Sequence, residues 1–167
     1  MKRLWAPWRR AYIRPKHQKD KRCLFCRLRQ DRRDSQNFIL YRNPTCYAVL
    51  NLYPYNNGHV LIVPNRHVDS FARLSRKERL DWLDLTQRVL AALSQSIRPH
   101  GFNIGMNLGQ VAGAGVPDHL HLHLVPRWQG DTNFMPVLGQ TRVISESLQS
   151  LYETLRPYFR QKKKRKR

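Results

Sequence analysis

The sequence predicts a single α+β domain, built on a five-stranded antiparallel sheet with two helices. The chain has 167 residues, short apolar runs bounded by turn residues recur along it, and two longer segments have the periodicity of amphipathic helices. The short connections favour antiparallel neighbours, because parallel strands need a long crossover. A chain of this length is able to bury a substantial core.

The elements are expected in the order three strands, helix, two strands, helix. The expected strands are residues 38–42, 46–52, 58–64, 102–108 and the histidine-rich run that begins at residue 118. The first three are expected to form a meander, and the last two a hairpin across the glycine-containing loop 109–118. The first helix is expected over residues 76–97, with a capping box formed by Ser75 and Glu78. Its expected apolar stripe is Leu80, Leu83, Leu90, Leu93 and Ile97, and the closing helix is expected to carry Ile144, Leu148, Leu151 and Leu155.

The net charge of +20 is concentrated at the two ends of the chain. Residues 34–161 carry 12 basic and nine acidic side chains, whereas residues 162–167 are all Lys or Arg. We therefore expect a basic arm with aromatic residues over 1–22, a globular domain over 23–160 and a disordered basic tail over 161–167. The ends are either solvated segments or loose, non-specific binders of nucleic acid or an anionic surface. Neither end contains a recognised base-reading motif.

Several protein classes are disfavoured by what the chain lacks. No apolar run approaches the roughly 20 residues of a transmembrane helix, and the N-terminus has no signal-peptide pattern. Three cysteines argue against a secreted disulfide framework, so we expect a cytoplasmic protein. There is no Walker A sequence and no GxGxxG motif after a strand.

The run Asp118-His-Leu-His-Leu-His-Leu-Val125 is the most informative segment. His119, His121 and His123 alternate with leucines, a period of two that predicts a strand with its three imidazoles on one face. The alternative is a half-buried strand whose polar face is histidine without a chemical role. Because histidine is uncommon, three on one face favour a functional site.

This run resembles the signature of the histidine triad (HIT) superfamily of nucleotide hydrolases and transferases. The resemblance continues upstream in Asn51-Leu-Tyr-Pro54 and Gly58-His-Val-Leu-Ile-Val-Pro64, which are similar to the family's nucleotide-binding strands. Further segments resemble the bacterial diadenosine tetraphosphate phosphorylase-like branch: Leu4-Trp-Ala-Pro-Trp8, Gly113-Ala-Gly-Val-Pro117 and the segment 125–136. The resemblance covers nearly all of the chain except the basic tail.

The resemblance implies roles for individual residues. His121 would be the nucleophile that attacks the α-phosphorus, which is reasonable for an imidazole that is neutral near pH 7. His123 and His59 would stabilise charge on the phosphate and the leaving oxygen, and His119 would complete the triad. The implied nucleotide-binding residues are Asn51 at the ribose, Asn107 near the phosphates, and the backbone of Gly113, Ala114 and Gly115.

The glycine loop departs from the family pattern. Many relatives carry Gln followed by Ser or Thr there, whereas this chain has Gly115 and Val116. We therefore expect a polyphosphate leaving group, which needs less protonation than the amine of a phosphoramidate.

Cys23-x-x-Cys26 is the pattern of half a zinc site. By resemblance to zinc-bearing relatives, His67 and His119 would complete the site for a structural zinc ion. The alternative is two packed or exposed cysteines with His67 at the surface. Cys46 is expected in the core, and no organic cofactor is expected.

Three functions remain open on the sequence. The favoured one is cleavage of dinucleoside polyphosphates such as diadenosine tetraphosphate through a nucleotidyl-histidine, with phosphorolysis favoured over hydrolysis. The second is hydrolysis of these compounds or of nucleoside phosphoramidates. The third is a nucleic-acid-associated protein that acts through its basic ends. The resemblance also implies a homodimer or a larger homo-oligomer.

Overall fold

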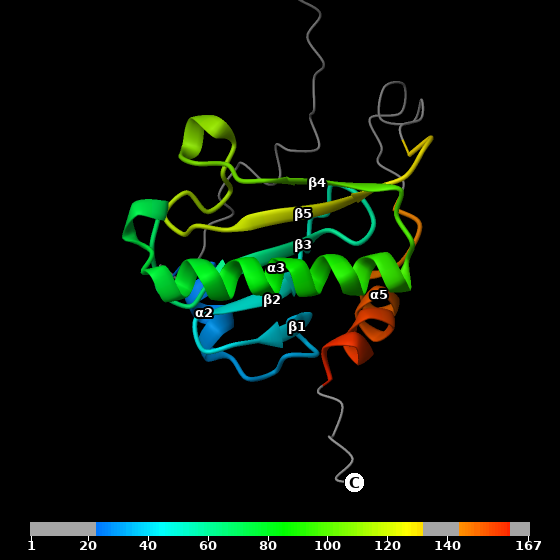
Figure 1. Cartoon of the computed structure of the whole chain (residues 1–167), viewed down its shortest axis with the longest axis horizontal. Coiled ribbons are helices and arrows are strands. Elements are labelled where there is room, and N and C mark those ends of the chain that lie inside the picture. The colour runs from blue at the N-terminus through cyan, green and yellow to red at the C-terminus, as the bar shows by residue number, and fades with distance from the viewer. Residues whose placement is uncertain (1–22, 132–143, 161–167) are drawn as a thin grey trace, which may run out of the picture.

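A computed structural model of the chain contains the expected five-stranded antiparallel sheet (Figure 1). It describes residues 23–131 and 144–160, so the predicted arm, the whole of the predicted tail and part of the segment 125–136 lie outside the described residues. The strands are β1 (Ile39–Arg42), β2 (Cys46–Leu50), β3 (Val60–Pro64), β4 (Gly101–Gly105) and β5 (Leu122–Arg127). Their order across the sheet is β1-β2-β3-β5-β4, which confirms the meander and the β4–β5 pair.

Three α-helices accompany the sheet in the described residues, where the sequence predicted two. They are α2 (Leu24–Gln30), α3 (Arg76–Ser96) and α5 (Leu148–Leu155). The seven residues of α2 are too few to show an amphipathic repeat, which explains why the pattern did not reveal it. Ile144 precedes α5 and is not part of it.

The sheet is covered on both faces. The long helix α3 crosses one face with α5 beside it, and α2 lies on the other (Figure 1). Successive residues of β3 alternate between two apolar clusters, with Ile62 in the larger one and Leu61 in the smaller one beside Phe25. His123 on β5 is the register partner of Leu61, so its side chain faces α2.

The buried face of α3 differs from the predicted stripe. Leu80 and Leu83 are 52% and 66% exposed, so their assignment to the core was wrong. The buried residues of α3 are Glu78, Trp82, Leu85, Thr86, Val89, Ala92 and Leu93. These recur at intervals of three and four and include Trp82, which the leucine pattern overlooked.

The predicted histidine strand is only partly a strand. β5 begins at Leu122, so His119 and His121 precede it, and the N–H of Leu120 donates to the Val68 carbonyl instead. The rings nevertheless stay close together. Phe25 contacts the rings of both His119 and His121, with centroids 5.4 and 5.0 Å away. The imidazoles therefore gather on the α2 side although the strand pairing does not reach them.

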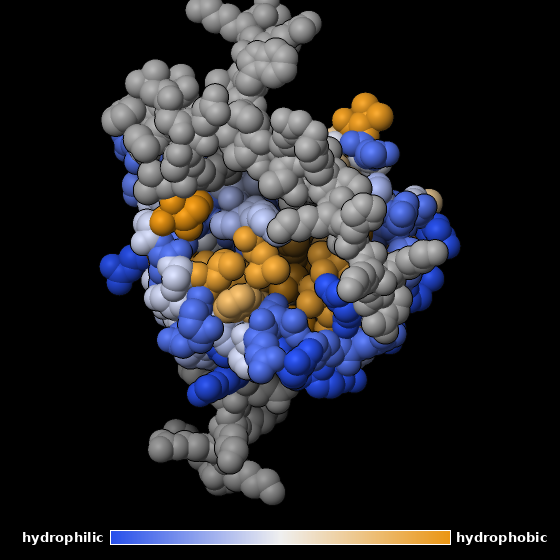
Figure 2. Space-filling view, turned by 180° about the vertical axis from the view of Figure 1, so that it is seen from behind, coloured by the Kyte–Doolittle hydropathy of each residue, from blue (hydrophilic) through white to orange (hydrophobic). Residues whose placement is uncertain are grey.

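The surface on the side away from α3 has a distinct pattern. Hydrophobic residues gather near its centre, and hydrophilic residues border them (Figure 2). Within residues 23–131 and 144–160, no helix has the length and apolar character needed to cross a membrane.

The capping box of α3 gives a stability prediction. Ser75 Oγ accepts from the Glu78 N–H at 3.2 Å, and Glu78 Oε2 accepts from the Ser75 N–H at 2.8 Å. Ser75→Ala is expected to lower the free energy of unfolding by about 1 kcal/mol, because an orphan helix N–H loses its acceptor. Urea denaturation measures this, with Ser94→Ala on the exposed side of α3 as the control. Equal destabilisation by the two variants would contradict the prediction.

Candidate active site

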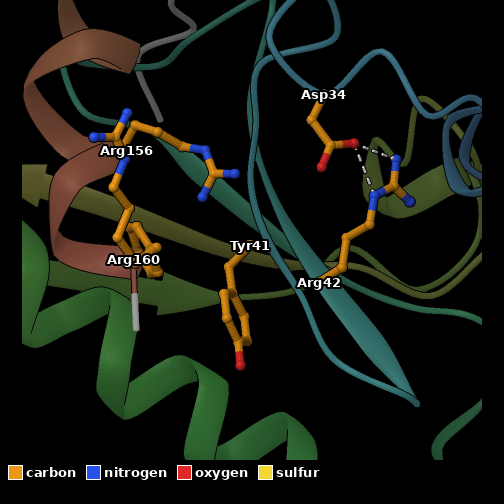
Figure 3. Close-up of a pocket in the computed structure, with 6 residues that line it drawn as sticks. Asp34, Tyr41, Arg42, Arg156 and Arg160 are labelled. Carbon is orange, nitrogen blue, oxygen red and sulfur yellow. Dashed lines mark hydrogen bonds and ion pairs between the residues drawn. The ribbon is translucent and has the colours of Figure 1, made fainter. Parts of the chain in front are cut away.

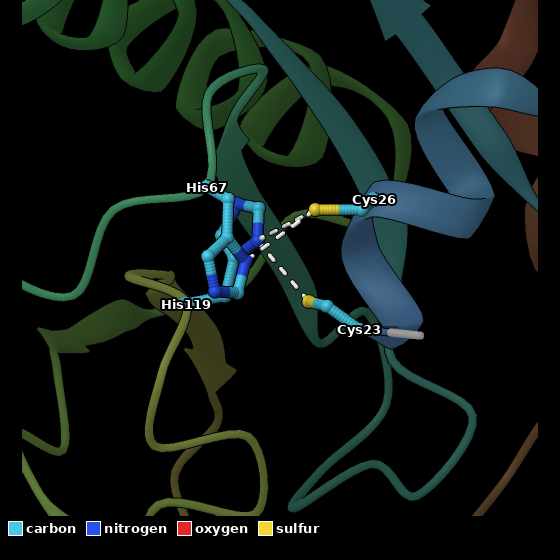
Figure 4. A group of neighbouring side chains, drawn as sticks. All are labelled: Cys23, Cys26, His67 and His119. Atoms are coloured by element: carbon cyan, nitrogen blue, oxygen red, sulfur yellow. Dashed lines mark hydrogen bonds between the residues drawn. The ribbon is translucent and has the colours of Figure 1, made fainter. Parts of the chain in front are cut away.

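Four potential metal ligands from three parts of the chain meet on the α2 side of the sheet. Cys23 and Cys26 lie at the start of α2, His67 follows β3, and His119 precedes β5 (Figure 4). One ligand atom from each residue lies within 4.8 Å of all the others. The structure therefore brings together all four residues that the sequence and the resemblance named for zinc.

The spacing of these atoms fits a tetrahedral ion. Cys23 Sγ lies 3.3 Å and Cys26 Sγ 3.6 Å from His119 Nδ1, and Cys26 Sγ lies 3.4 Å from His67 Nδ1. Bonds of about 2.3 Å to sulfur and 2.0 Å to nitrogen in a tetrahedron would separate such atoms by about 3.5 Å. Burial and the neighbouring Cys23 raise the pKa of the Cys26 thiol, so a thiolate here requires a nearby cation.

The ring of His119 is held at both nitrogens. Its Nε2–H donates to the Pro64 carbonyl at 2.9 Å, which leaves the lone pair on Nδ1, the nitrogen that faces the cysteines. Burial lowers the pKa of His119 to about 4, so the ring is neutral near pH 7. A metal-binding histidine is usually neutral, with the nitrogen that does not bind the metal donating to a carbonyl or carboxylate.

His121 is oriented by the backbone of the same segment. Its Nδ1 lies 2.8 Å from the His119 carbonyl oxygen, and because a carbonyl only accepts, Nδ1 must carry the proton. The lone pair is therefore on Nε2. His121 is only 4% exposed. This burial lowers the pKa of His121 and so favours the neutral, nucleophilic form of the ring.

Two consecutive hydrogen bonds determine which ring nitrogen carries the proton in His59 and in His123. The backbone N–H of Tyr55 donates to His59 Nδ1 at 3.0 Å, so the proton of His59 is on Nε2. That Nε2–H donates to His123 Nδ1 at 2.9 Å, which places the His123 proton on Nε2. His123 Nε2 is buried and has no hydrogen-bond partner within the described part of the chain. Burial, with a smaller contribution from His121, lowers the pKa of His123 to about 4, so this ring is a neutral donor.

Two aromatic residues that the sequence analysis missed support these rings. Tyr55 stacks on His123 with centroids 5.5 Å apart and an interplanar angle of 9°. Phe25, between the two cysteines, packs on His119 and His121, and its carbonyl accepts from the Tyr47 hydroxyl at 2.8 Å. Their positions inside Cys23-x-x-Cys26 and next to Asn51-Leu-Tyr-Pro54 were the available signal.

Asn51 lies against His59. Its Nδ2 is 3.2 Å from His59 Nδ1, and its Oδ1 accepts from the Tyr53 N–H at 3.0 Å. Both ends of the Asn51 amide are therefore engaged, and the side chain is 8% exposed. Asn51 thus helps to hold the segment that leads to His59. Asn107 is half-buried in the segment after β4.

The glycine loop has fewer free donors than predicted. The N–H groups of Gly113 and Ala114 donate within the loop, to the carbonyls of Gln110 and Gly109. Of the three loop residues expected to bind the nucleotide through their backbone, Gly115 alone has an N–H without a hydrogen-bond partner among the described residues. Gly115 is exposed, and Val116 packs against the smaller apolar cluster.

The HIT domain family model matches residues 32–130, a segment that contains all of the histidines described above. The chain belongs to the HIT domain family. This confirms the resemblance on which the site assignments depend. The five-stranded antiparallel fold also matches that of solved HIT-family structures.

Named relatives agree with this membership. This chain is 38% identical over 155 residues to AP-4-A phosphorylase of Mycobacterium tuberculosis. The matched segment covers 89% of this chain and 79% of the relative. The chain is 33% identical over 93 residues to a bis(5'-nucleosyl)-tetraphosphatase [asymmetrical] of Schizosaccharomyces pombe, covering 56% and 50% of the two chains. A zinc-bound histidine triad family protein from Mycobacterium smegmatis superposes with a TM-score of 0.66 at 25% identity, over 82% of this chain and 92% of the other.

Gly58, which precedes His59, provides a test of how the site is positioned. Its φ is +76°, and an added Cβ would lie 2.6 Å from Ile97 Cδ1 and 2.8 Å from Pro126 Cγ. Gly58→Ala is expected to lower the free energy of unfolding by about 1–3 kcal/mol, through backbone strain and overpacking. Gly101→Ala on β4 is the matched control, because a Cβ there meets no described atom within 4 Å. Urea unfolding curves compare the two, and a Gly58→Ala protein as stable as the control would refute the packing argument.

Proposed function

We propose that this HIT protein cleaves dinucleoside polyphosphates, with diadenosine tetraphosphate as the favoured substrate, through a nucleotidyl intermediate on His121. The observation that carries the proposal is the hydrogen-bond pattern that assigns opposite tautomers to two adjacent rings. His121 has its lone pair on Nε2 and His123 has its proton on Nε2, with ring centroids 5.0 Å apart. A nucleophile and a hydrogen-bond donor thus stand side by side in a buried site.

In the first step, His121 Nε2 attacks the α-phosphorus. A P–N bond forms, and the bond from the α-phosphorus to the bridging oxygen breaks. The electron pair of that bond leaves on the terminal phosphate of ATP when the substrate is diadenosine tetraphosphate. The Nε2–H of His123 stabilises negative charge on the phosphoryl or leaving oxygen, and His59 holds the donor in place.

The state of His123 favours a polyphosphate leaving group. A neutral imidazole donates a hydrogen bond readily, but it gives up its remaining proton only to a strong base. Its pKa of about 4 means that the protonated ring, which is the effective acid, is scarce near pH 7. A polyphosphate leaves as an anion without a proton, whereas the amine of a phosphoramidate requires one. Gly115 and Val116 add no acidic or amide side chain that would supply it.

In the second step, an acceptor displaces His121 from the nucleotidyl group. Inorganic phosphate would convert the AMP moiety to ADP, and water would release AMP. The 38% identity with AP-4-A phosphorylase favours phosphate. We assign Asn51 and Asn107 to the nucleotide and the N–H of Gly115 to its phosphates, since this N–H is free among the described residues.

We further propose that Cys23, Cys26, His67 and His119 hold a structural zinc ion. The donor distances described above and the zinc-bound relative support this assignment. Zinc would link α2 to the segment before β5 and would stabilise the two thiolates. Both nitrogens of His119 are then engaged, so His119 positions His121 through its carbonyl and does not contact the substrate.

Product analysis tests the proposed reaction. Incubation of the protein with diadenosine tetraphosphate and phosphate is expected to give ADP and ATP, and His121→Asn is expected to lower turnover by about 10⁴-fold or more because the nucleophile is removed. The surface variant His100→Asn should leave turnover unchanged. Release of AMP and ATP regardless of phosphate would identify water as the acceptor and reject phosphorolysis. Undiminished cleavage by His121→Asn would reject the covalent mechanism.

Metal analysis tests the zinc assignment. The purified protein is expected to contain about one zinc ion per chain, and Cys23→Ser should lose most of it because one of four ligands is missing. Cys46→Ser is the control, since Cys46 lies in the larger core cluster and outside the metal-ligand group. Elemental analysis gives the zinc content directly. A native protein without stoichiometric zinc, or a Cys23→Ser protein that retains it, would overturn the assignment.

A further inference from the structure

An arginine-lined cavity lies at the outer edge of the sheet beside β1. Its volume is about 390 Å³, and its walls are Asp34, Tyr41, Arg42, Arg156, Phe159 and Arg160. Asp34 and Arg42 lie on one side, and Arg156 and Arg160, from the helical segment near the end of the described chain, lie on the other (Figure 3). The proposed catalytic function uses none of these residues.

The cavity is separate from the candidate active site. β2 and β3 stand between β1 and the histidine-bearing β5 in the sheet. Tyr41 and Phe159 pack with the larger apolar cluster, on the α3 side, whereas the histidines face α2. A ligand of this cavity would therefore not contact the triad.

The single acidic side chain of the cavity is already neutralised. Arg42 contacts Asp34 at 2.9 Å, with side chains 17% and 30% exposed. Arg42 also donates to the carbonyls of Leu28, Arg29 and Asp31. This arginine thus joins the loop before β1 to the sheet, and its charge is matched by Asp34.

The two arginines on the opposite side have no such partner. Neither Arg156 nor Arg160 forms an ion pair with any described residue. A guanidinium has five N–H donors, and the described residues accept only one from Arg156, at the Leu40 carbonyl. The cavity therefore has a net charge of +2 and a surplus of donors with the geometry that suits phosphate.

An aromatic wall completes the cavity. Tyr41 is half-buried, and Arg88 lies over its ring at 4.1 Å from the centroid. Arg88 also donates to the Phe159 carbonyl at 3.0 Å, so Arg88 holds Tyr41 and Phe159 in position. Phe159 is 2% exposed, so Tyr41 provides the accessible aromatic surface beside the arginines. Such a surface suits a ligand that has both a phosphate and a base.

We propose that this cavity is a second phosphate-binding site, which binds the phosphodiester backbone of single-stranded RNA through Arg156 and Arg160. The sequence supports a ligand with repeated phosphates, since six consecutive basic residues, 162–167, follow the cavity after one intervening residue. A single nucleotide could occupy the cavity, but it would have no further phosphates for the basic residues 162–167. A membrane surface is flat, and the half-buried Tyr41 inside the cavity would not reach it.

Titration of the full chain with a fluorescent single-stranded RNA of about 12 nucleotides, at several salt concentrations, tests the proposal. Arg156→Gln/Arg160→Gln is expected to weaken binding at least about fivefold, and loss of two phosphate contacts should reduce the slope of log affinity against log salt by about 1.4. The control, Arg76→Gln/Arg79→Gln, removes the same charge from exposed positions at the start of α3 and should leave the slope unchanged. Arg160→Gln alone, at an exposed side chain, should reduce the slope by about 0.7 even if the double variant is unstable.

The remaining outcomes decide against the proposal. Equal losses in the two double variants would show that net charge, and no particular site, attracts the RNA. An unchanged slope for both variants at the cavity would locate binding elsewhere on the chain. Binding of phosphatidylserine vesicles that depends on Arg156 and Arg160, without RNA binding, would assign the cavity to a membrane surface instead.

Discussion

The hydrogen bond from His121 Nδ1–H to the His119 carbonyl is the constraint on which the catalytic account depends. It places the only lone pair of a neutral His121 on Nε2. The carbonyl can do this because the His119 ring is held between the Pro64 carbonyl and the cysteine pair. A metal ion at the cluster would therefore act on catalysis only indirectly, by fixing the residue that orients the nucleophile.

Burial and backbone donors together determine the charge states in the site. Removing imidazoles from water favours their neutral forms, and the pKa values of His119 and His123 fall to about 4. The Tyr55 N–H then selects the tautomer of His59, and His59 selects that of His123. A site built in this way stabilises developing negative charge with preorganised dipoles and does not depend on a protonated acid.

Much of this could be predicted from the sequence, because the residues that carry chemistry are grouped in short motifs. The Cys23-x-x-Cys26 pair and the Ser75–Glu78 box each predicted a contact that the structure contains. The alternation in the histidine run predicted that its rings share one side of the sheet, although the strand itself begins only at Leu122. Other features depend on tertiary packing. The length of β5 and the burial of Trp82 in place of Leu83 follow from which neighbours each segment meets. The stacking of Tyr55 on His123, and the cavity at Arg156, join distant segments that no local pattern relates.

The tautomers of His121 and His123 are the most direct test of the account. Nitrogen-15 NMR of the imidazoles in the intact protein at pH 7, assigned with single histidine variants, distinguishes the neutral Nδ1–H, the neutral Nε2–H and the protonated forms. The account predicts Nδ1–H for His121 and Nε2–H for His123, both neutral. An Nε2–H tautomer or a protonated ring at His121 would leave no lone pair on Nε2 for attack on phosphorus and would contradict it.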